Sequence, residues 1–150
     1  MSYADKPANP ADIRRAAMNL LARREHAYKE LKLKLCRRFD DEALVDEQLQ
    51  RLVDENLQSD QRYAESFVRQ RVARGQGPQR IERDARQKGI TGAQLQRALD
   101  GAEVDWHQLA LDVLQKKFGG SPATELKEKS RRARFMQYRG FLQEQFDQFL

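Results

Sequence analysis

Apolar residues along this chain recur at intervals of three and four positions, which is the spacing of amphipathic helices. The two-residue alternation that marks half-buried strands is not seen in any segment. Breaks rich in proline, glycine, asparagine and aspartate divide the pattern into about nine segments, which fall into three groups of three. We therefore predict an all-α fold of about nine helices, with no strand.

The hydrophobic pattern also repeats at a fixed distance. Phe39, Ile90 and Phe141 are spaced 51 residues apart (90 − 39 and 141 − 90), and each ends a basic amphipathic segment. Another large apolar residue follows five positions later in each case. A fixed period of this size is typical of tandem supersecondary units that pack on their neighbours. We expect three tandem three-helix repeats, which favour an extended binding surface over a single catalytic cleft.

The repeat boundaries follow from the breaks in the pattern. Residues 1–11 lack periodicity and contain two prolines, so we expect a flexible N-terminal lead-in. The three repeats are then predicted at 12–58, 59–102 and 103–150. Side chains that can accept hydrogen bonds from a first helical turn predict N-caps at Asp12, Asp60 and Thr91, and Pro78 suits the first turn of the helix that follows it.

Composition narrows the kinds of partner. The chain has 150 residues, of which 39% are hydrophobic, and its net charge of +5 and pI of about 9.5 point to an acidic partner, either nucleic acid or an acidic protein surface. The charge also alternates in sign with the repeat. Residues 14–38 contain nine Lys/Arg and two acids, whereas residues 40–60 contain eight acids and one arginine. The middle helix of each repeat is thus basic and the third acidic, although an ordinary solvated surface with mixed charges is the alternative.

Several functional classes receive no support from the sequence. Cys36 is the single cysteine, so an internal disulfide or a cysteine-cluster metal site is not possible, and we expect this thiol to be buried. His26 and His107 have no second ligand nearby, so structural roles are expected. No segment reaches the roughly 18 consecutive apolar residues of a membrane span, and none resembles a signal peptide. We expect a cytoplasmic, monomeric protein that is not an enzyme and needs no metal or cofactor.

Two basic groups are candidate contact surfaces. The denser one lies at 127–139, with Phe135 and Tyr138 interleaved; their helical spacing predicts that at least one belongs to the core. The other straddles Gly75-Gln76-Gly77-Pro78, which ends one helix and starts the next and lacks the features of a phosphate loop. The predicted partner-contacting residues are Arg24, Lys34, Arg62, Arg69, Arg71, Arg74, Arg80, Arg83, Lys127, Arg131, Arg132, Arg134 and Arg139. The predicted structural residues are Phe39, Tyr63, Phe67, Ile90, Leu95, Trp106, Phe141 and Phe146.

A direct DNA-binding role of the helix-turn-helix type is the alternative. The Gly89-Ile90-Thr91 turn before Gln94, Gln96 and Arg97 resembles the entry to a recognition helix. The third helices are the acidic ones, however, and a helix that approaches phosphate needs the opposite charge.

With these residues in view, the chain resembles the RecX family, regulatory proteins that restrain the bacterial RecA recombinase. The most specific segment contains Asp60-x-Arg62-Tyr63-Ala64-x-x-Phe67, then Gly77-Pro78-x-Arg80-Ile81 and Lys88-Gly89-Ile90. The end of the chain adds Arg134-Phe135-x-x-Arg139-Gly140-Phe141. Three positions depart from the family pattern: Arg38 stands where glycine is usual, Ala85 where leucine is usual, and Ala27-Tyr28 where a small polar residue and arginine are common.

The resemblance implies three tandem three-helix modules in an elongated, curved array, with successive helices crossing near right angles. It implies binding to the RecA–DNA filament, with weaker binding to single- and double-stranded DNA. The expected outcome is negative regulation of recombination and DNA repair, including the SOS response, by inhibiting filament extension, ATP hydrolysis and strand exchange.

Overall fold

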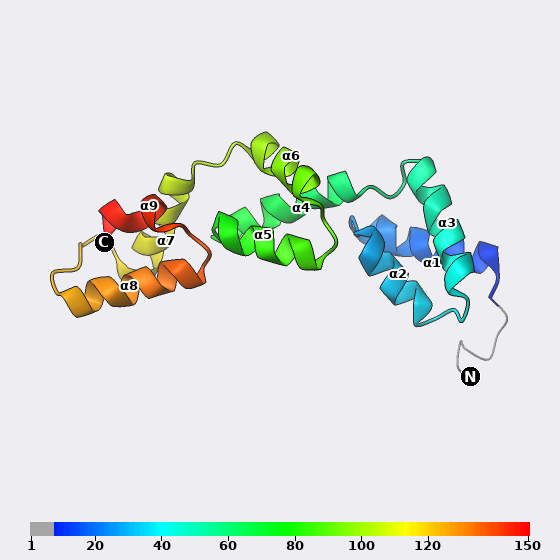
Figure 1. Cartoon of the computed structure of the whole chain (residues 1–150), viewed down its shortest axis with the longest axis horizontal. Helices are drawn as coiled ribbons and strands as arrows, with labels where there is room; N and C mark the ends of the chain where they lie inside the picture. The colour runs from blue at the N-terminus through cyan, green and yellow to red at the C-terminus, as the bar shows by residue number, and fades with distance from the viewer. Residues whose placement is uncertain (1–7) are drawn as a thin grey trace.

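The computed structural model describes residues 8–150, and over this range the chain is all-α, with no strand (Figure 1). The prediction of an all-α fold is confirmed. In chain order the elements are α1 (Pro10–Arg23), α2 (Tyr28–Cys36), α3 (Glu42–Asp54), α4 (Asp60–Ala73), α5 (Pro78–Gln87), α6 (Gly92–Ala102), α7 (Trp106–Phe118), α8 (Leu126–Tyr138), α9 (Gln143–Phe146) and the 3-10 helix η2 (Asp147–Phe149). The helices α1–α3, α4–α6 and α7–α9 form three groups, which follow one another along the long axis of an elongated molecule (Figure 1).

Two predicted N-caps are wrong. The cap of α1 is Asn9, whose Oδ1 accepts from the Ala11 N–H at 2.8 Å, so Pro10 and Ala11 are helical and Asp12 lies in the first turn. The rest of the expected lead-in, residues 1–7, is outside the described residues. Ser59, not Asp60, caps α4. In both cases the capping side chain belongs to the extended residue directly before the helix. The nearby aspartate lies in the first turn, where its negative charge interacts favourably with the positive end of the helix dipole.

The other two helix starts agree with the sequence. Thr91 Oγ1 accepts from the Gln94 N–H at 3.2 Å, and the Gln94 side chain accepts from the Thr91 N–H at 2.9 Å, so the two residues form a capping box. Pro78 is in the first turn of α5, where its missing N–H costs no hydrogen bond. Both predictions are confirmed.

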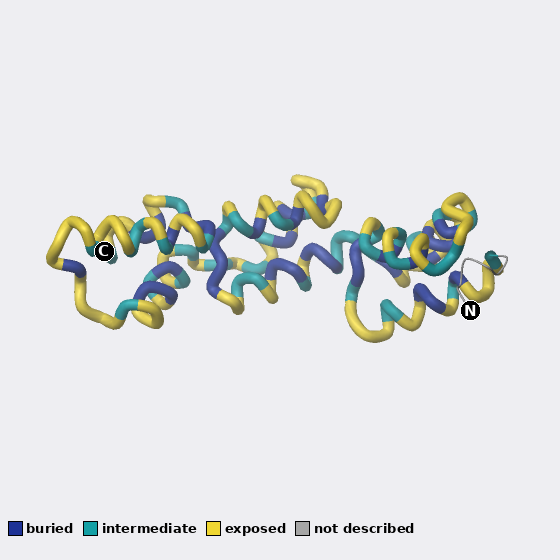
Figure 2. Tube along the Cα trace, turned by 90° about the horizontal axis from the view of Figure 1, so that it is seen from below, coloured by how far each residue is buried: buried dark blue, intermediate teal, exposed yellow. Residues whose placement is uncertain are grey.

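Each three-helix unit has its own hydrophobic cluster, and neighbouring clusters share residues at their boundaries. Ala27 precedes α2 but belongs to the cluster built mainly from α4–α6, and Trp106 at the start of α7 packs against both that cluster and the next. Buried residues (dark blue) accordingly recur through all three units (Figure 2). The units therefore pack against one another. Phe141, Phe146, Ile90, Leu95, Tyr63 and Phe67 are buried, while Phe39 and Trp106 are partly buried against their clusters.

The ends of the middle helices show how arginine at position 38, where the family usually has glycine, changes the end of α2. Gly89 and Gly140 have φ of 82° and 95°, and the next residue bonds five positions back, as in a Schellman motif. Arg38 does not adopt positive φ, and Phe39 N bonds four positions back to Leu35 O at 2.9 Å. An arginine at this position thus ends α2 differently, because a side chain disfavours the left-handed region.

Candidate functional site

The three basic middle helices, α2, α5 and α8, lie along the same edge of the molecule, the lower edge in Figure 1. This arrangement follows from the repeat, because each unit presents the same helix in the same direction. Two arginines there, Arg80 of α5 and Arg139 at the end of α8, also take part in a contact between units. We call the contact of α1–α3 with α4–α6 the first junction, and the contact of α4–α6 with α7–α9 the second junction.

Side chains hold the first junction together. The Tyr28 N–H donates to Asp60 Oδ1 at 2.8 Å, and Gln58 Nε2 donates to the same oxygen at 2.9 Å and to the His26 carbonyl at 3.1 Å. Arg62 Nε donates to Glu25 Oε1 at 3.0 Å. Arg62 also donates to the side chain and carbonyl of Asn56, both at 2.9 Å. The guanidinium of Arg62 is therefore used to join the two units.

His26 is buried at the first junction, where its exposure is 1%. Its Nδ1 lies 3.0 Å from the Arg24 carbonyl, which can only accept, so Nδ1 holds the proton. Nε2 then accepts from Lys34 Nζ at 3.4 Å. Burial lowers the pKa of His26, and the nearby Arg24 and Lys34 charges act in the same direction. The structure thus favours a neutral imidazole with a structural role.

A cavity of about 370 Å³ opens at the first junction, and both arginines on its lining are paired with acids. Arg24 makes a bidentate pair with Glu30, with Nη1–Oε1 at 3.0 Å and Nη2–Oε2 at 2.6 Å. Burial acts to raise the pKa of Glu30, but the Arg24 hydrogen bond and the surrounding positive charges outweigh it and the pKa is lowered. Arg71, on the same cavity, pairs with Asp84 and lies 4.6 Å above the Phe67 ring.

The second junction is formed largely by the backbone. The Gly77 N–H donates to the Arg139 carbonyl at 2.8 Å, and the Gln79 N–H donates to the Gly140 carbonyl at 3.0 Å. A Cβ on Gly77 would lie 2.4 Å from backbone atoms of Gly140 and Phe141, and a Cβ on Gly140 would lie 2.4 Å from Arg80 Cβ. The Gly75–Pro78 turn is therefore more than a boundary between helices. It docks against the turn at the end of α8, which sequence reasoning missed although the glycines themselves were visible.

The structure divides the thirteen predicted contact residues. Six have guanidinium groups that contact other groups of the protein. Arg24 pairs with Glu30, Arg62 with Glu25, and Arg71 with Asp84 and Gln76. Arg80 lies over the Tyr138 ring, Arg132 bonds to Glu128 and the Ser121 carbonyl, and Arg139 bonds to the Arg74 carbonyl. Three more have side chains that are at least partly exposed but form an ion pair: Lys34 with Glu30, Arg83 with Asp84, and Arg131 with Glu128. Among residues 8–150, four have exposed side chains with no ion pair: Arg69, Arg74, Lys127 and Arg134.

On α8 one carboxylate organises two arginines. Glu128 accepts from Arg131 Nε at 2.8 Å and from Arg132 Nε at 3.2 Å, and these bonds hold the pKa of Glu128 at about 2. Arg132 is mostly buried and also lies 5.1 Å from the Phe118 ring centroid. Its role is therefore structural, whereas Arg134 on the same helix faces solvent.

Three further expectations can be compared with the structure. Phe135 packs against the third hydrophobic cluster while Tyr138 is 74% exposed, so the prediction that at least one belongs to the core is confirmed. The prediction for Cys36 is wrong: the thiol is exposed, because it is the last residue of α2 and the neighbouring Leu35 is the one that faces the core. In the described part of the chain, no group of three His, Cys, Asp or Glu side chains could hold a metal ion, and no helix is long and apolar enough to cross a membrane.

Comparison with known proteins agrees with this architecture. Residues 59–99 match the family model described as the second three-helix domain of RecX, and residues 103–150 match the third. The chain is 44% identical over 132 residues to the regulatory protein RecX of Pseudomonas putida (strain GB-1), covering 88% of this chain and 85% of that one. It is 44% identical over 133 residues to that of Halorhodospira halophila, covering 89% and 83%.

Solved structures show the same fold. The crystal structure of RecX from Lactobacillus salivarius superposes with a TM-score of 0.77 at 23% identity, covering 93% of both chains. A second RecX crystal structure gives a TM-score of 0.79, also at 23% identity, covering 93% of this chain and 72% of that one. From the two domain matches and the identity over most of its length, the chain belongs to the RecX family of regulatory proteins.

Proposed function

We propose that this protein is a negative regulator that binds the RecA–DNA filament and inhibits its extension, ATP hydrolysis and strand exchange. The observation that supports this most strongly is the 44% identity, over 88% of the chain, to a protein named regulatory protein RecX. In this proposal the protein catalyses no reaction and acts by occupying the filament. Direct binding to single- or double-stranded DNA is weaker than binding to the filament.

The geometry suggests how an elongated helical array would engage a filament. The basic helices α2, α5 and α8 share one edge, so several weak contacts could form along a periodic acidic surface (Figure 1). Contacts held on one connected array act at high effective concentration, and their combined affinity exceeds that of each alone. We propose that the main ionic contacts are made by the exposed, unpaired side chains Lys127 and Arg134 of α8 and by Arg69 and Arg74 at the end of α4, which leads into α5. Arg83 and Arg131 assist them.

The direct test is the ATPase rate of recombinase bound to single-stranded DNA, measured while this protein is titrated. We expect the rate to fall with increasing protein and the inhibition to weaken at higher salt, because phosphate contacts release counterions. An unchanged rate at saturating protein would contradict the proposal. Tight binding to duplex DNA without recombinase would instead favour a direct DNA-binding protein.

The structure also selects which arginines to change. Replacing Arg69, Arg74 and Arg134 together with alanine should raise the half-inhibitory concentration about tenfold, since three exposed charges at about 0.5 kcal/mol each contribute about 1.5 kcal/mol. The matched control is the triple replacement of Arg15, Arg23 and Arg97, which are also exposed but lie outside the predicted set. Equal effects of the two triple variants would show that net charge, and not this surface, governs inhibition.

A further inference from the structure

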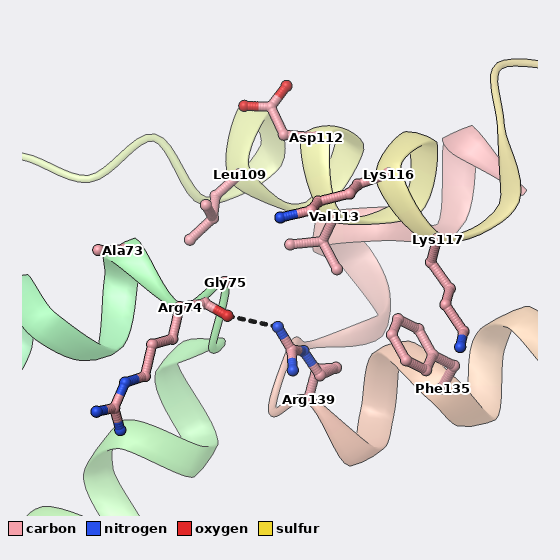
Figure 3. Close-up of a pocket in the computed structure, with 10 residues that line it drawn as sticks. All are labelled: Ala73, Arg74, Gly75, Leu109, Asp112, Val113, Lys116, Lys117, Phe135 and Arg139. Carbon is pink, nitrogen blue, oxygen red and sulfur yellow. Dashed lines mark hydrogen bonds between the residues drawn. The ribbon is translucent and has the colours of Figure 1, made fainter.

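A cavity of about 490 Å³ lies at the second junction, bounded by the Gly75 turn, α7 and the C-terminal end of α8 (Figure 3). Cavities of this size hold small molecules or a few side chains of an extended peptide. It differs from the cavity at the first junction in its charge.

The cations at this cavity have no anionic partner. Arg74, Lys116, Lys117 and Arg139 line it, and within residues 8–150 no carboxylate lies within ion-pair distance of any of the four. The Arg74 guanidinium extends away from the other three, as Figure 3 shows. Asp112 also borders the cavity, but Figure 3 shows its carboxylate extending away from Arg139, whereas Lys116 extends over the cavity toward the Gly75 turn. Like charges held together in a concave site repel one another until an anion neutralises them.

Arg139 is fixed in place with unused hydrogen-bonding capacity. Its Nη2 donates to the Arg74 carbonyl across the junction, as the dashed line in Figure 3 marks. Its Nε is buried and has no hydrogen-bond partner. A ligand cannot reach the buried Nε, so the donors left for an anion are those of the two Nη groups. Guanidinium donors lie in a rigid plane that matches a carboxylate or phosphate, and the bond to Arg74 fixes that plane in advance.

The remaining lining distinguishes between the two kinds of anion. The one aromatic ring on this cavity, Phe135, already has Lys117 Nζ 5.4 Å and Arg139 Cζ 5.9 Å from its centroid, and the Phe118 ring packs against it edge-on at 5.4 Å. A nucleobase would need a free ring face for stacking. The other apolar side chains are those of Ala73, Leu109 and Val113, and their aliphatic groups suit an aliphatic side chain of a ligand.

We propose that this cavity binds an acidic segment of a protein partner. Carboxylates of the segment neutralise Lys116, Lys117 and Arg139, and an aliphatic side chain of the segment packs on Leu109 and Val113. The inference depends on the proposed function in one respect, the identity of the protein that supplies the segment. Binding of the segment itself can be measured without recombinase, so failure of this inference and failure of the proposed function give different results.

The test uses the full chain and a short fluorescent peptide of leucine and glutamate, with fluorescence anisotropy as the readout. The Lys116→Gln/Lys117→Gln variant should bind the peptide about tenfold more weakly, since two charge contacts of about 0.7 kcal/mol each are lost. The matched control is Lys88→Gln/Lys129→Gln, which removes the same charge from exposed positions outside this cavity and outside the predicted contact set. A Leu109→Asn variant tests the apolar part, and a peptide with glutamine in place of glutamate tests the need for carboxylates.

We expect the control variant to change affinity less than twofold, and the glutamine peptide not to bind. Equal weakening by both lysine pairs, or no binding of the glutamate peptide to wild type, would overturn the proposal. A single-stranded oligonucleotide measured in parallel gives the remaining outcome. If the Lys116/Lys117 variant loses oligonucleotide affinity and keeps peptide affinity, the cavity binds phosphate and the acidic segment is excluded. Unchanged helicity by circular dichroism confirms that each variant is folded.

Discussion

The two junctions join the same kinds of element by different chemistry. Tyr28 and Gln79 are equivalent positions in the 51-residue repeat (79 − 28), and both donate their backbone N–H to the next unit. At the first junction the acceptor is a side chain, Asp60 Oδ1 at 2.8 Å. At the second it is the Gly140 carbonyl, at 3.0 Å. The same donor position is thus satisfied in two ways.

The difference affects what each junction tolerates. Side-chain contacts such as Glu25–Arg62 depend on charge, so pH and salt modulate the first junction. Backbone contacts are insensitive to both, but they require that no side chain intervene, which restricts Gly77 and Gly140 to glycine. The second junction also leaves four cations without carboxylate partners within the described residues, whereas the first pairs Arg24 and Arg71 with acids.

The largest expected effect is steric and falls on the second junction. Gly77→Ala should reduce the free energy of unfolding by about 1–3 kcal/mol, because its Cβ would lie 2.4 Å from backbone atoms that cannot move aside as a flexible side chain would. Urea denaturation followed by circular dichroism measures the change. Gly92→Ala is the control, since nothing lies within 4 Å of its Cβ position. Equal stability of the two variants would mean that the turns do not dock closely.

A smaller effect, dependent on salt, is expected at the first junction. A double-mutant cycle with Glu25→Gln and Arg62→Met should give a coupling energy of about 0.5 kcal/mol, because both side chains are about one-third exposed and partly screened. The coupling should decrease at about 1 M salt. Glu47 and Arg51, an exposed pair on α3, provide the control cycle. A coupling that does not change with salt would argue against an ionic contribution.

The first junction should also weaken in mild acid. The pKa of His26 is lowered in the folded protein, so the unfolded chain binds the proton more readily and stability falls as pH drops below the unfolded value of about 6.5. Protonation would place the His26 charge beside those of Lys34 and Arg24, and Glu30 acts in the opposite direction. Melting temperatures between about pH 7 and pH 5 should decrease less in His26→Asn than in wild type.

The pKa of Glu30 is lowered, so this carboxylate stays ionised in the folded protein between about pH 7 and pH 5 and does not contribute to the difference between the two proteins. His107→Asn, a change at an exposed histidine, should retain the acid dependence of wild type. If the His26 variant and wild type respond equally to acid, another group is responsible.

The smallest expected effect concerns the two cavities. Lys116→Gln/Lys117→Gln should leave the free energy of unfolding unchanged or raise it by a few tenths of a kcal/mol, because it removes unpaired like charges. Arg24→Gln at the first cavity should lower it, because Glu30 loses its bidentate partner. Thermal melting of both variants measures the difference. A loss of stability in the lysine variant would indicate that these cations have intramolecular partners in solution.

The sequence by itself determined the features that depend on neighbouring residues. Helical spacing, the capping box at Thr91 and the placement of Pro78 arise from contacts within about one turn, so they could be predicted before the structure. The 51-residue period also identified Ile90 and Phe141 as apolar anchors, and both are buried. The caps at Asn9 and Ser59 were missed, because a nearby aspartate gives the same local signal one or more positions away.

Only the tertiary structure decided which basic side chains remain available. Arg62 and Arg132 look like Arg69 and Arg134 in the sequence, yet the first two are used by Glu25, Glu128 and the Ser121 carbonyl. Likewise the need for glycine at position 77 depends on Gly140, which is 63 residues away (140 − 77). The physical reason is that helix formation is local, whereas the pairing of a charge or the approach of two backbones depends on segments that meet only in the folded chain.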